Sequence, residues 1–222
     1  MKLYGVVSSR ASRNVWLANE LGIELERIPV IQAYRLEEQG VDPRSSDAPF
    51  NTLSPEFLEL SPAGMVPLLV DGDLALFESF AINHYLAEKS GGELAPQDAQ
   101  ERAQIEQWGL YGTSAIEPLA LDIMWTYVKG RAQSEAGMAE LERLREALLR
   151  PMAVLEAHLV RKGVMVGDRF TVADINMAEV LRYAAFDAPL MARFGAVAAW
   201  LERCHARPAF KMMMAERAAE TL

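Results

Sequence analysis

The chain has 222 residues, of which 51% are hydrophobic, and its formal net charge is −9. This length allows one large domain or two small ones with a proper core. Because phosphate contacts need a basic face, and because the 22 Lys and Arg residues form no block, the composition argues against a nucleic-acid partner.

Membrane, disulfide and metal signals are missing from the sequence. No apolar run approaches the 18 or more residues of a membrane span, and the apolar stretch after Met1 is too short for a signal peptide. Cys204 is the single cysteine, which excludes a disulfide framework and a cysteine metal cluster. The three histidines are scattered, so we expect no metal site. Because no membrane span or signal peptide is predicted, we expect a cytoplasmic protein with no membrane partner.

The first thirty residues predict a strand, a helix and a second strand. Residues 2–7 read as a short buried strand, and the helical pattern that follows stops at Gly22. A second strand is predicted near residues 25–30. Arg10 and Arg13, at the start of the helix, are candidates for a local cluster that binds a small anion.

A long segment, residues 31–61, separates this second strand from the next apolar run. It is rich in Pro, Ser, Asp and Gly, and a short helix is predicted over residues 54–60. Long segments without regular structure are often lids or binding loops. A surface insertion is the alternative, and the sequence leaves both open.

A proline corner and a hairpin follow. Pro67 stands where an extended run begins, and Asp71-Gly72 is a strong hairpin signal within residues 68–76. A cis Val66-Pro67 bond would suit this corner. Such a corner leaves the N–H and C=O of Val66 outside the sheet, where an extended ligand backbone can dock on them as an added strand.

The string Phe77-Glu78-Ser79 comes directly after the hairpin and opens a helix predicted over residues 80–88. Ser79 can cap this helix, and the neighbouring N–H groups can hold a carboxylate. Glu78 can hold an ammonium group. Together with Val66, these residues indicate a pocket for a peptide.

The rest of the chain reads as helical. Residues 90–96 predict a linker, and residues 99–128 predict one long amphipathic helix. Pro151 falls inside the next helical pattern and should kink or divide it. The buried face of that pattern is formed by residues at helical spacing: Leu141, Leu144, Leu148, Met152, Leu155 and Leu159.

Two further helices complete the prediction. Thr171-Val172-Ala173-Asp174 is a variant of the capping box and starts a helix near Ile175. A last helix is predicted over residues 191–205, before Arg207-Pro208. The run Met212-Met213-Met214 beyond it is either part of a pocket lining or a mobile tail.

This order of elements resembles the cytosolic glutathione transferases over nearly the whole chain. The string 170–175 is similar to the capping box in the helical domain of that family. The resemblance implies an α/β thioredoxin-like N-terminal domain that binds glutathione (residues 1–89), a linker (90–98) and an all-α C-terminal domain that forms the electrophile site (99–222). It further implies a cytoplasmic, homodimeric detoxification enzyme.

The chemistry that the resemblance implies needs a group that stabilises a thiolate. A free thiol titrates near about 8.5, so a mostly anionic thiol at neutral pH requires a shift of roughly 2 units, or about 2.7 kcal/mol. One charge-assisted hydrogen bond of about 1.5 to 3 kcal/mol, with help from a helix N-terminus, covers most of that. In the serine-type classes, a serine four residues before an arginine has this role.

Ser9 and Arg13 match that spacing, so Ser9 is the predicted catalytic residue. Ser12, which is predicted to cap the helix, and Ser8 stay open as alternatives. Tyr4 lies in the middle of the first strand and is predicted to belong to the core. The stretch from Ser8 to Ser12 contains no cysteine, so the cysteine-type classes do not match.

The resemblance also assigns the peptide pocket. Val66 would pair its backbone with the cysteinyl unit of glutathione, and Pro67 would hold the bend. Glu78 and Ser79 would receive the amino and carboxylate groups of the γ-glutamyl unit. Asn51 stands near the place where the family often has a polar contact to the glycyl end.

The electrophile site would lie along the long helix and the C-terminal segment. Trp108, Tyr111 and Trp125 would provide an aromatic surface for a small apolar electrophile, although core packing is the commoner role of such residues. Two alternatives stay open. One is a non-catalytic interaction or ligand-binding module on the same fold, and the other is a glutathione-dependent peroxidase, dehalogenase or isomerase.

Overall fold

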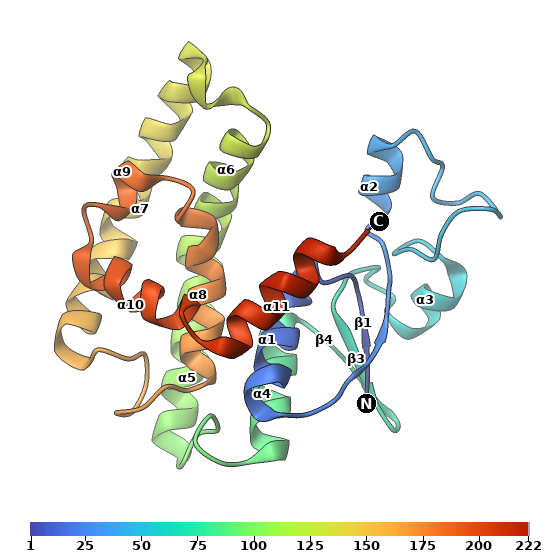
Figure 1. The fold of residues 1–222 in the computed structure, drawn as a ribbon, viewed down its shortest axis with the longest axis horizontal. Helices are drawn as coiled ribbons and strands as arrows, with labels where there is room; N and C mark the ends of the chain where they lie inside the picture. Colours follow the sequence, from blue (N-terminus) through green and yellow to red (C-terminus); the bar gives the residue numbers. More distant parts are fainter. Residues whose placement is uncertain (222) are drawn as a thin grey trace. The chain divides into compact units, whose positions relative to one another are not determined.

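The computed structural model describes residues 1–221 and divides into two compact units (Figure 1). Unit 1 consists of Met1–Ser90 together with the chain from Pro208 onward, and unit 2 is Gly91–Arg207. Residue 222, the last of the predicted helical domain, lies outside the described residues. Of the helices within residues 1–221, none is long and apolar enough to cross a membrane.

Unit 1 is built on a mixed sheet with the strand order β2-β1-β3-β4. β1 pairs parallel with β2 and antiparallel with β3, and β3 pairs antiparallel with β4. The hairpin predicted from Asp71-Gly72 is confirmed, and its two turn residues are Gly72 and Asp73, since Asp71 still pairs with Leu74. The strands are β1 (Lys2–Tyr4), β2 (Glu26–Ile28), β3 (Leu68–Asp71) and β4 (Leu74–Phe77).

β1 is shorter than the predicted run because of Gly5. Gly5 has φ +131°, a conformation that side chains of L residues rarely adopt. A Cβ atom there would lie 3.2 Å from Cβ of Val66 and 3.3 Å from Cβ of Ala11. The glycine therefore lets the proline corner approach the loop that leads into the first helix.

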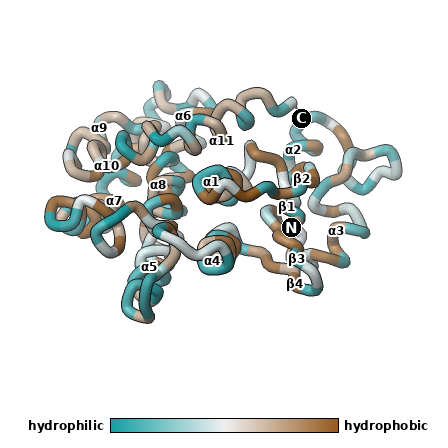
Figure 2. Tube along the Cα trace, turned by 60° about the horizontal axis from the view of Figure 1, so that its bottom comes forward, coloured by the Kyte–Doolittle hydropathy of each residue, from teal (hydrophilic) through white to brown (hydrophobic). Residues whose placement is uncertain are grey.

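Helices cover both faces of the sheet (Figure 2). α1 (Ser12–Leu21) and α4 (Ser79–Ser90) pack against each other on one face, and α2 (Ala33–Glu38) and α3 (Pro55–Leu60) lie on the other. The helix expected over residues 54–60 is confirmed as α3, whereas α2 was not predicted. Phe57 of α3 packs with Val30 and Leu68, and the Tyr4 ring joins this cluster, which confirms Tyr4 as a core residue.

A helix that the sequence analysis did not predict completes unit 1. α11 (Pro208–Ala219) begins at the proline that was interpreted as the end of helical structure. A proline is well suited to the first position of a helix, where its missing N–H is not needed. α11 packs on α1, with the ring of Phe210 against Trp16 at a centroid distance of 4.8 Å. The segment after Pro208 thus packs with the N-terminal residues, not with the helical residues to which it was assigned.

Unit 2 is helical in the residues that the structure describes. The helices are α5 (Ala99–Tyr111), a π-helical segment η1 (Gly112–Ile116), α6 (Glu117–Val128), a 3-10 turn η2 (Arg131–Gln133), α7 (Glu135–Lys162), α8 (Val172–Ala184), α9 (Ala188–Met191) and α10 (Gly195–His205).

The predicted long helix over residues 99–128 is interrupted by η1. Pro118 has no N–H to continue the α-helical ladder. The hydroxyl of Thr113 donates to the carbonyl of Gly109 at 3.1 Å, and that of Ser114 donates to the carbonyl of Leu110 at 2.7 Å. These bonds satisfy carbonyl groups near the wider segment. The prediction of one regular helix was wrong at this point.

Pro151 does not divide its helix, because α7 continues from Glu135 to Lys162. The predicted leucine-rich face is buried on both sides of the proline, and this packing holds the helix together. At the start of α8 the predicted capping box is confirmed. The N–H of Thr171 donates to Oδ2 of Asp174 at 2.9 Å.

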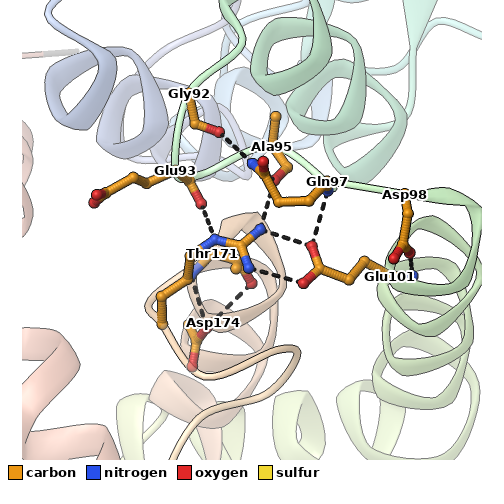
Figure 3. Close-up of polar contacts among 9 residues, drawn as sticks. Gly92, Glu93, Ala95, Gln97, Asp98, Glu101, Thr171 and Asp174 are labelled. Atoms are coloured by element: carbon orange, nitrogen blue, oxygen red, sulfur yellow. Dashed lines mark hydrogen bonds and ion pairs between the residues drawn. The ribbon is translucent and has the colours of Figure 1, made fainter.

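The predicted linker, residues 90–96, is held by the half-buried ion pair of Arg169 and Glu101 and by hydrogen bonds from the same arginine (Figure 3). Nε of Arg169 donates to the carbonyl of Glu93 at 2.8 Å, and Nη2 donates to that of Ala95 at 3.0 Å. The same guanidinium forms a bidentate pair with Glu101, at 2.8 and 2.6 Å. Residues 91–96 of the predicted linker are therefore an ordered part of unit 2, whereas Ser90 ends α4 in unit 1.

Candidate active site

The hydroxyl of Ser9, the predicted catalytic group, is used within its own turn. Ser9 is 6% exposed. Its Oγ donates to the carbonyl of Val6 at 2.6 Å and accepts from the N–H of Ala11 at 3.1 Å. A hydroxyl has one proton, and here that proton stabilises the turn. Ser9 must break a short hydrogen bond before it can donate to a ligand.

Ser8 has the opposite arrangement. Its half-buried Oγ accepts from Nη1 of Arg35 at 2.8 Å, and its carbonyl accepts from Nη2 of the same guanidinium at 2.9 Å. Arg35 only donates, so the Ser8 hydroxyl keeps its proton. Within residues 1–221 no group accepts that proton. Ser8 can therefore donate to an anion, and the adjacent guanidinium favours negative charge there.

Ser12 lies inside α1 as its first residue and is fully buried. The residue in the N-cap position is Ala11, which has no side-chain oxygen. The predicted role of Ser12 as the helix cap is therefore not what the structure shows. Its burial also removes it from contact with a ligand at the surface of the unit.

The proline corner has the predicted form. The Val66-Pro67 peptide bond is cis. Pairing of β3 with β1 and β4 begins at Leu68, so Val66 lies outside both ladders. Val66 approaches the loop after β1 closely because Gly5 has no side chain. The backbone of Val66 and the Ser8 loop thus lie at the same end of the two central strands, β1 and β3.

Glu78 and Ser79 lie where α4 begins. Glu78 has φ +70°, which is rare for a residue with a side chain, and its side chain is exposed. Ser79 is buried, and its Oγ accepts from Nη1 of Arg13 at 3.1 Å. Asn14 donates to the carbonyl of Ser79 at 2.8 Å. The N-terminus of α4 and the buried guanidinium of Arg13 together favour an anion beside Ser79.

Asn51 serves the loop in which it lies. Its Nδ2 donates to the carbonyl groups of Pro43 and Pro49, at 2.9 and 2.8 Å, and its Oδ1 accepts from the N–H of Leu53 at 2.8 Å. The side chain is buried. Asn51 therefore orders the segment between β2 and α3, and this bonding leaves it poorly placed for the predicted contact with a ligand.

Both halves of the chain match glutathione S-transferase family models. Residues 7–89 match the N-terminal domain of glutathione S-transferase, and residues 116–208 match the C-terminal domain. Glutathione S-transferase 3 of Zea mays is 34% identical over 97% of this chain and 93% of its own length. The chain belongs to the glutathione S-transferase family. The predicted family, fold and function as a glutathione transferase are thereby confirmed.

Other relatives of this glutathione transferase agree. Glutathione S-transferase F9 of Arabidopsis thaliana is 30% identical over 97% of both chains. The solved structure of glutathione S-transferase III in its apo form has a TM-score of 0.75 and 34% identity, over 96% of this chain and 95% of its own. That of glutathione S-transferase I bound with lactoylglutathione has a TM-score of 0.78 and 27% identity, over 97% and 98%.

The aromatic residues predicted for the electrophile site of the transferase differ in their surroundings. Trp108 packs within unit 2 against His158, at a centroid distance of 4.5 Å, and is 9% exposed. Tyr111 and Trp125 are partly exposed. Burial raises the pKa of the Tyr111 phenol, which donates to the carbonyl of Pro151 at 3.3 Å and stays neutral at physiological pH. Trp108 is thus a core residue.

Three residues at the site escaped sequence reasoning: Arg35, Arg217 and Glu220. Arg35 bonds to Ser8 across 27 positions of the sequence. Glu220 accepts hydrogen bonds from the N–H groups of Val7 and Ser8. No local motif links such distant positions, and the signal that comes nearest is the acidic and basic composition at the end of the chain.

Proposed function

We propose that this glutathione transferase uses Ser8 to stabilise the thiolate of glutathione, which then attacks an electrophilic carbon of a small apolar compound. The observation that carries this proposal is the unused proton of the Ser8 hydroxyl beside the Arg35 guanidinium. In contrast, the hydroxyl of the predicted Ser9 donates its hydrogen bond to the carbonyl of Val6. The loop between β1 and α1 that contains Ser8 and Ser9, here named the serine loop, keeps the predicted role, and within it the proposed role passes from Ser9 to Ser8.

The other predicted pocket residues keep their proposed roles in unit 1. The backbone of Val66 pairs with the cysteinyl unit, and Pro67 shapes the corner. The exposed carboxylate of Glu78 receives the γ-glutamyl ammonium group. Ser79, the first N–H groups of α4 and the nearby Arg13 receive the γ-glutamyl carboxylate. We do not assign Asn51 to the glycyl end, because its side chain is fully bonded within its loop.

The reaction balances without a further reagent. The glutathione thiol loses its proton to solvent, and the sulfur forms a bond to the electrophilic carbon. With a chloronitroaromatic compound, chloride leaves with the electrons of the broken carbon–chlorine bond. Tyr111 and Trp125 are proposed to contribute to the surface that holds the apolar part of the electrophile.

The test compares Ser8→Ala and Ser9→Ala in a conjugation assay with a chloronitroaromatic substrate. Loss of a hydrogen bond to an anion costs about 1.5 to 3 kcal/mol, so we expect kcat of S8A to fall roughly 10- to 150-fold. S9A should keep kcat within a few fold and lose thermal stability, because it removes a bond of the turn. Full activity of S8A together with a collapse of S9A would return the role to Ser9.

A binding experiment separates the transferase from the non-catalytic module. We expect the wild-type protein to be retained on immobilised glutathione and to be eluted by free glutathione. The lactoylglutathione bound in a relative of similar fold supports this expectation. A protein that passes through the column would favour the module. A panel of electrophiles and hydroperoxides then separates conjugation from the peroxidase, dehalogenase and isomerase alternatives.

Assembly and location complete the proposal. We propose a cytoplasmic homodimer with a role in detoxification, as the family resemblance implies. Sedimentation velocity should give twice the chain mass of 24.6 kDa. A species of the single-chain mass at micromolar concentration would contradict the homodimer.

A further inference from the structure

The peptide between Val7 and Ser8 is held by Arg217, in the last turn of α11, and by Glu220, directly after that helix. Oε1 of Glu220 accepts from the N–H of Val7 at 2.7 Å, and Oε2 accepts from the N–H of Ser8 at 2.8 Å. Nη1 of Arg217 donates to the carbonyl of Val7 at 2.8 Å. Both sides of one peptide unit are therefore fixed by charged side chains from residues more than 200 positions away.

This contact is supported by the packing of α11 within unit 1. Phe210 packs on Trp16, and Nδ2 of Asn19 donates to the carbonyl of Ala209 at 3.4 Å. One turn before Glu220, Glu216 forms an ion pair with Arg27. Glu220 thus reaches the serine loop from the end of α11, a helix that is anchored along α1.

We infer that Glu220 is a positioning residue, which holds the Ser8 main chain so that the Ser8 hydroxyl points at the sulfur of glutathione. This inference rests on the proposed function of Ser8. Arg35 fixes the Ser8 carbonyl and Oγ from one side, and Glu220 fixes the Ser8 N–H from the other. With the bonds from Arg35 and Glu220 both formed, the proton of the Ser8 hydroxyl is directed toward the glutathione sulfur.

The charge and the positioning role of Glu220 have opposite effects on the pKa of bound glutathione. A carboxylate near the site disfavours a thiolate, so removal of its charge alone would lower the pKa of bound glutathione. Loss of Ser8 positioning has the opposite effect, because the thiolate loses a well-aligned hydrogen bond. A purely structural role of Glu220 would reduce stability and leave the pKa of bound glutathione unchanged.

The experiment compares Glu220→Gln with Glu216→Gln in the full chain. Glu216 is the matched control, because it lies on α11 one turn before Glu220 and the substitution removes the same charge, while the contact of Glu216 is with Arg27 and not with the serine loop. The pKa of bound glutathione is measured from the ultraviolet absorbance of its thiolate as the pH is raised. The kcat and KM for glutathione and the thermal midpoint are measured for each variant.

We expect the pKa of bound glutathione to rise by about one unit in E220Q, which is a tenfold smaller ratio of thiolate to thiol at any given pH. The kcat should fall about tenfold, since misplaced groups lose rate steeply. The KM for glutathione should change less than twofold, because Val66, Glu78 and Ser79 are untouched. E216Q should match the wild type in pKa and kcat.

An unchanged or lowered pKa of bound glutathione in E220Q, with a normal wild type, would overturn the positioning role and leave the proposed function intact. Equal losses in E220Q and E216Q would do the same, because they would report stability alone. A wild-type protein that shows no thiolate absorbance with glutathione would overturn the proposed function and this inference with it.

Discussion

At the scale of single residues, the use of one proton distinguishes two neighbouring serines. Spacing to Arg13 narrows the candidates to the serines of one short loop, and the sequence can go no further. The choice depends on whether a carbonyl or a guanidinium faces each hydroxyl. The carbonyl of Val6 accepts the hydrogen bond of the Ser9 hydroxyl. Arg35 of α2 only donates to the Ser8 hydroxyl, so the proton of Ser8 stays available for a ligand. Such partners are set by tertiary structure and have no signature in the local sequence.

Glu78 stores strain that can be separated from its binding role. Its φ of +70° costs a residue with a side chain about 1 to 2 kcal/mol, whereas glycine adopts this conformation freely. We expect Glu78→Gly to raise the free energy of unfolding by about 1 kcal/mol and to raise the KM for glutathione. Glu78→Ala should weaken glutathione binding without the gain in stability. Equal stability of the two variants in urea denaturation would contradict the strain.

At the scale of elements, the sequence predicted those that its local signals mark clearly. Asp71-Gly72 marked the hairpin, and Thr171 with Asp174 marked the start of α8, and both are confirmed. α11 was missed because Pro208 was interpreted as a stop, although a proline fits the first turn of a helix as well as the end of one. Packing on α1 decides between these two roles, and a sequence pattern does not contain it.

The ion pair that holds the linker should show in the pH dependence of stability. Hydrogen bonds from Arg169 hold the pKa of Glu101 at about 2, below its ordinary 4.5. A depressed carboxyl pKa stabilises the fold at pH values above 4.5, and this stabilisation is lost as the pH falls toward 2. We expect Glu101→Gln to cost up to about 3 kcal/mol at pH 7 and progressively less below pH 4.5.

Chemical denaturation at pH 7, 5 and 3 measures this difference. Glu140→Gln is the control, because Glu140 pairs with Arg143 on the exposed surface of α7. Exposed pairs contribute little to stability, so E140Q should unfold like the wild type at each pH. A loss in E101Q that stays the same from pH 7 to pH 3 would show that the charge of Glu101 is not its source.

At the scale of the whole molecule, the order of elements carried the fold. A β-α-β opening, a proline corner, a hairpin and a helix, followed by helices alone, led to the family that the comparisons show. The order of elements does not predict which residues make up each compact unit, because the segment after Pro208 packs with residues 1–90. Contacts between distant parts of a chain follow from complementary surfaces, which a linear reading of elements does not include.

This division predicts where glutathione protects the protein. Hydrogen exchange followed by mass spectrometry should show slower exchange with glutathione in peptides that cover residues 7–13 and 64–82. Peptides from residues 208–220 should follow them, because Arg217 and Glu220 bond to the serine loop. α7 of unit 2 should change least. Unchanged exchange in α11 would show that the tail does not respond to the ligand.

Because α11 packs on α1, unit 1 is completed only after residues far along the chain have been synthesised. All of unit 2 leaves the ribosome before α11 does, so the helical unit can close while unit 1 still lacks a helix. The serine loop receives its hydrogen bonds from Glu220 only after all of unit 2 has emerged. A nascent chain that stalls before residue 208 thus has the sheet and α1 of unit 1, but the apolar face of α1 at Trp16 stays exposed because α11 is not yet there to pack on it.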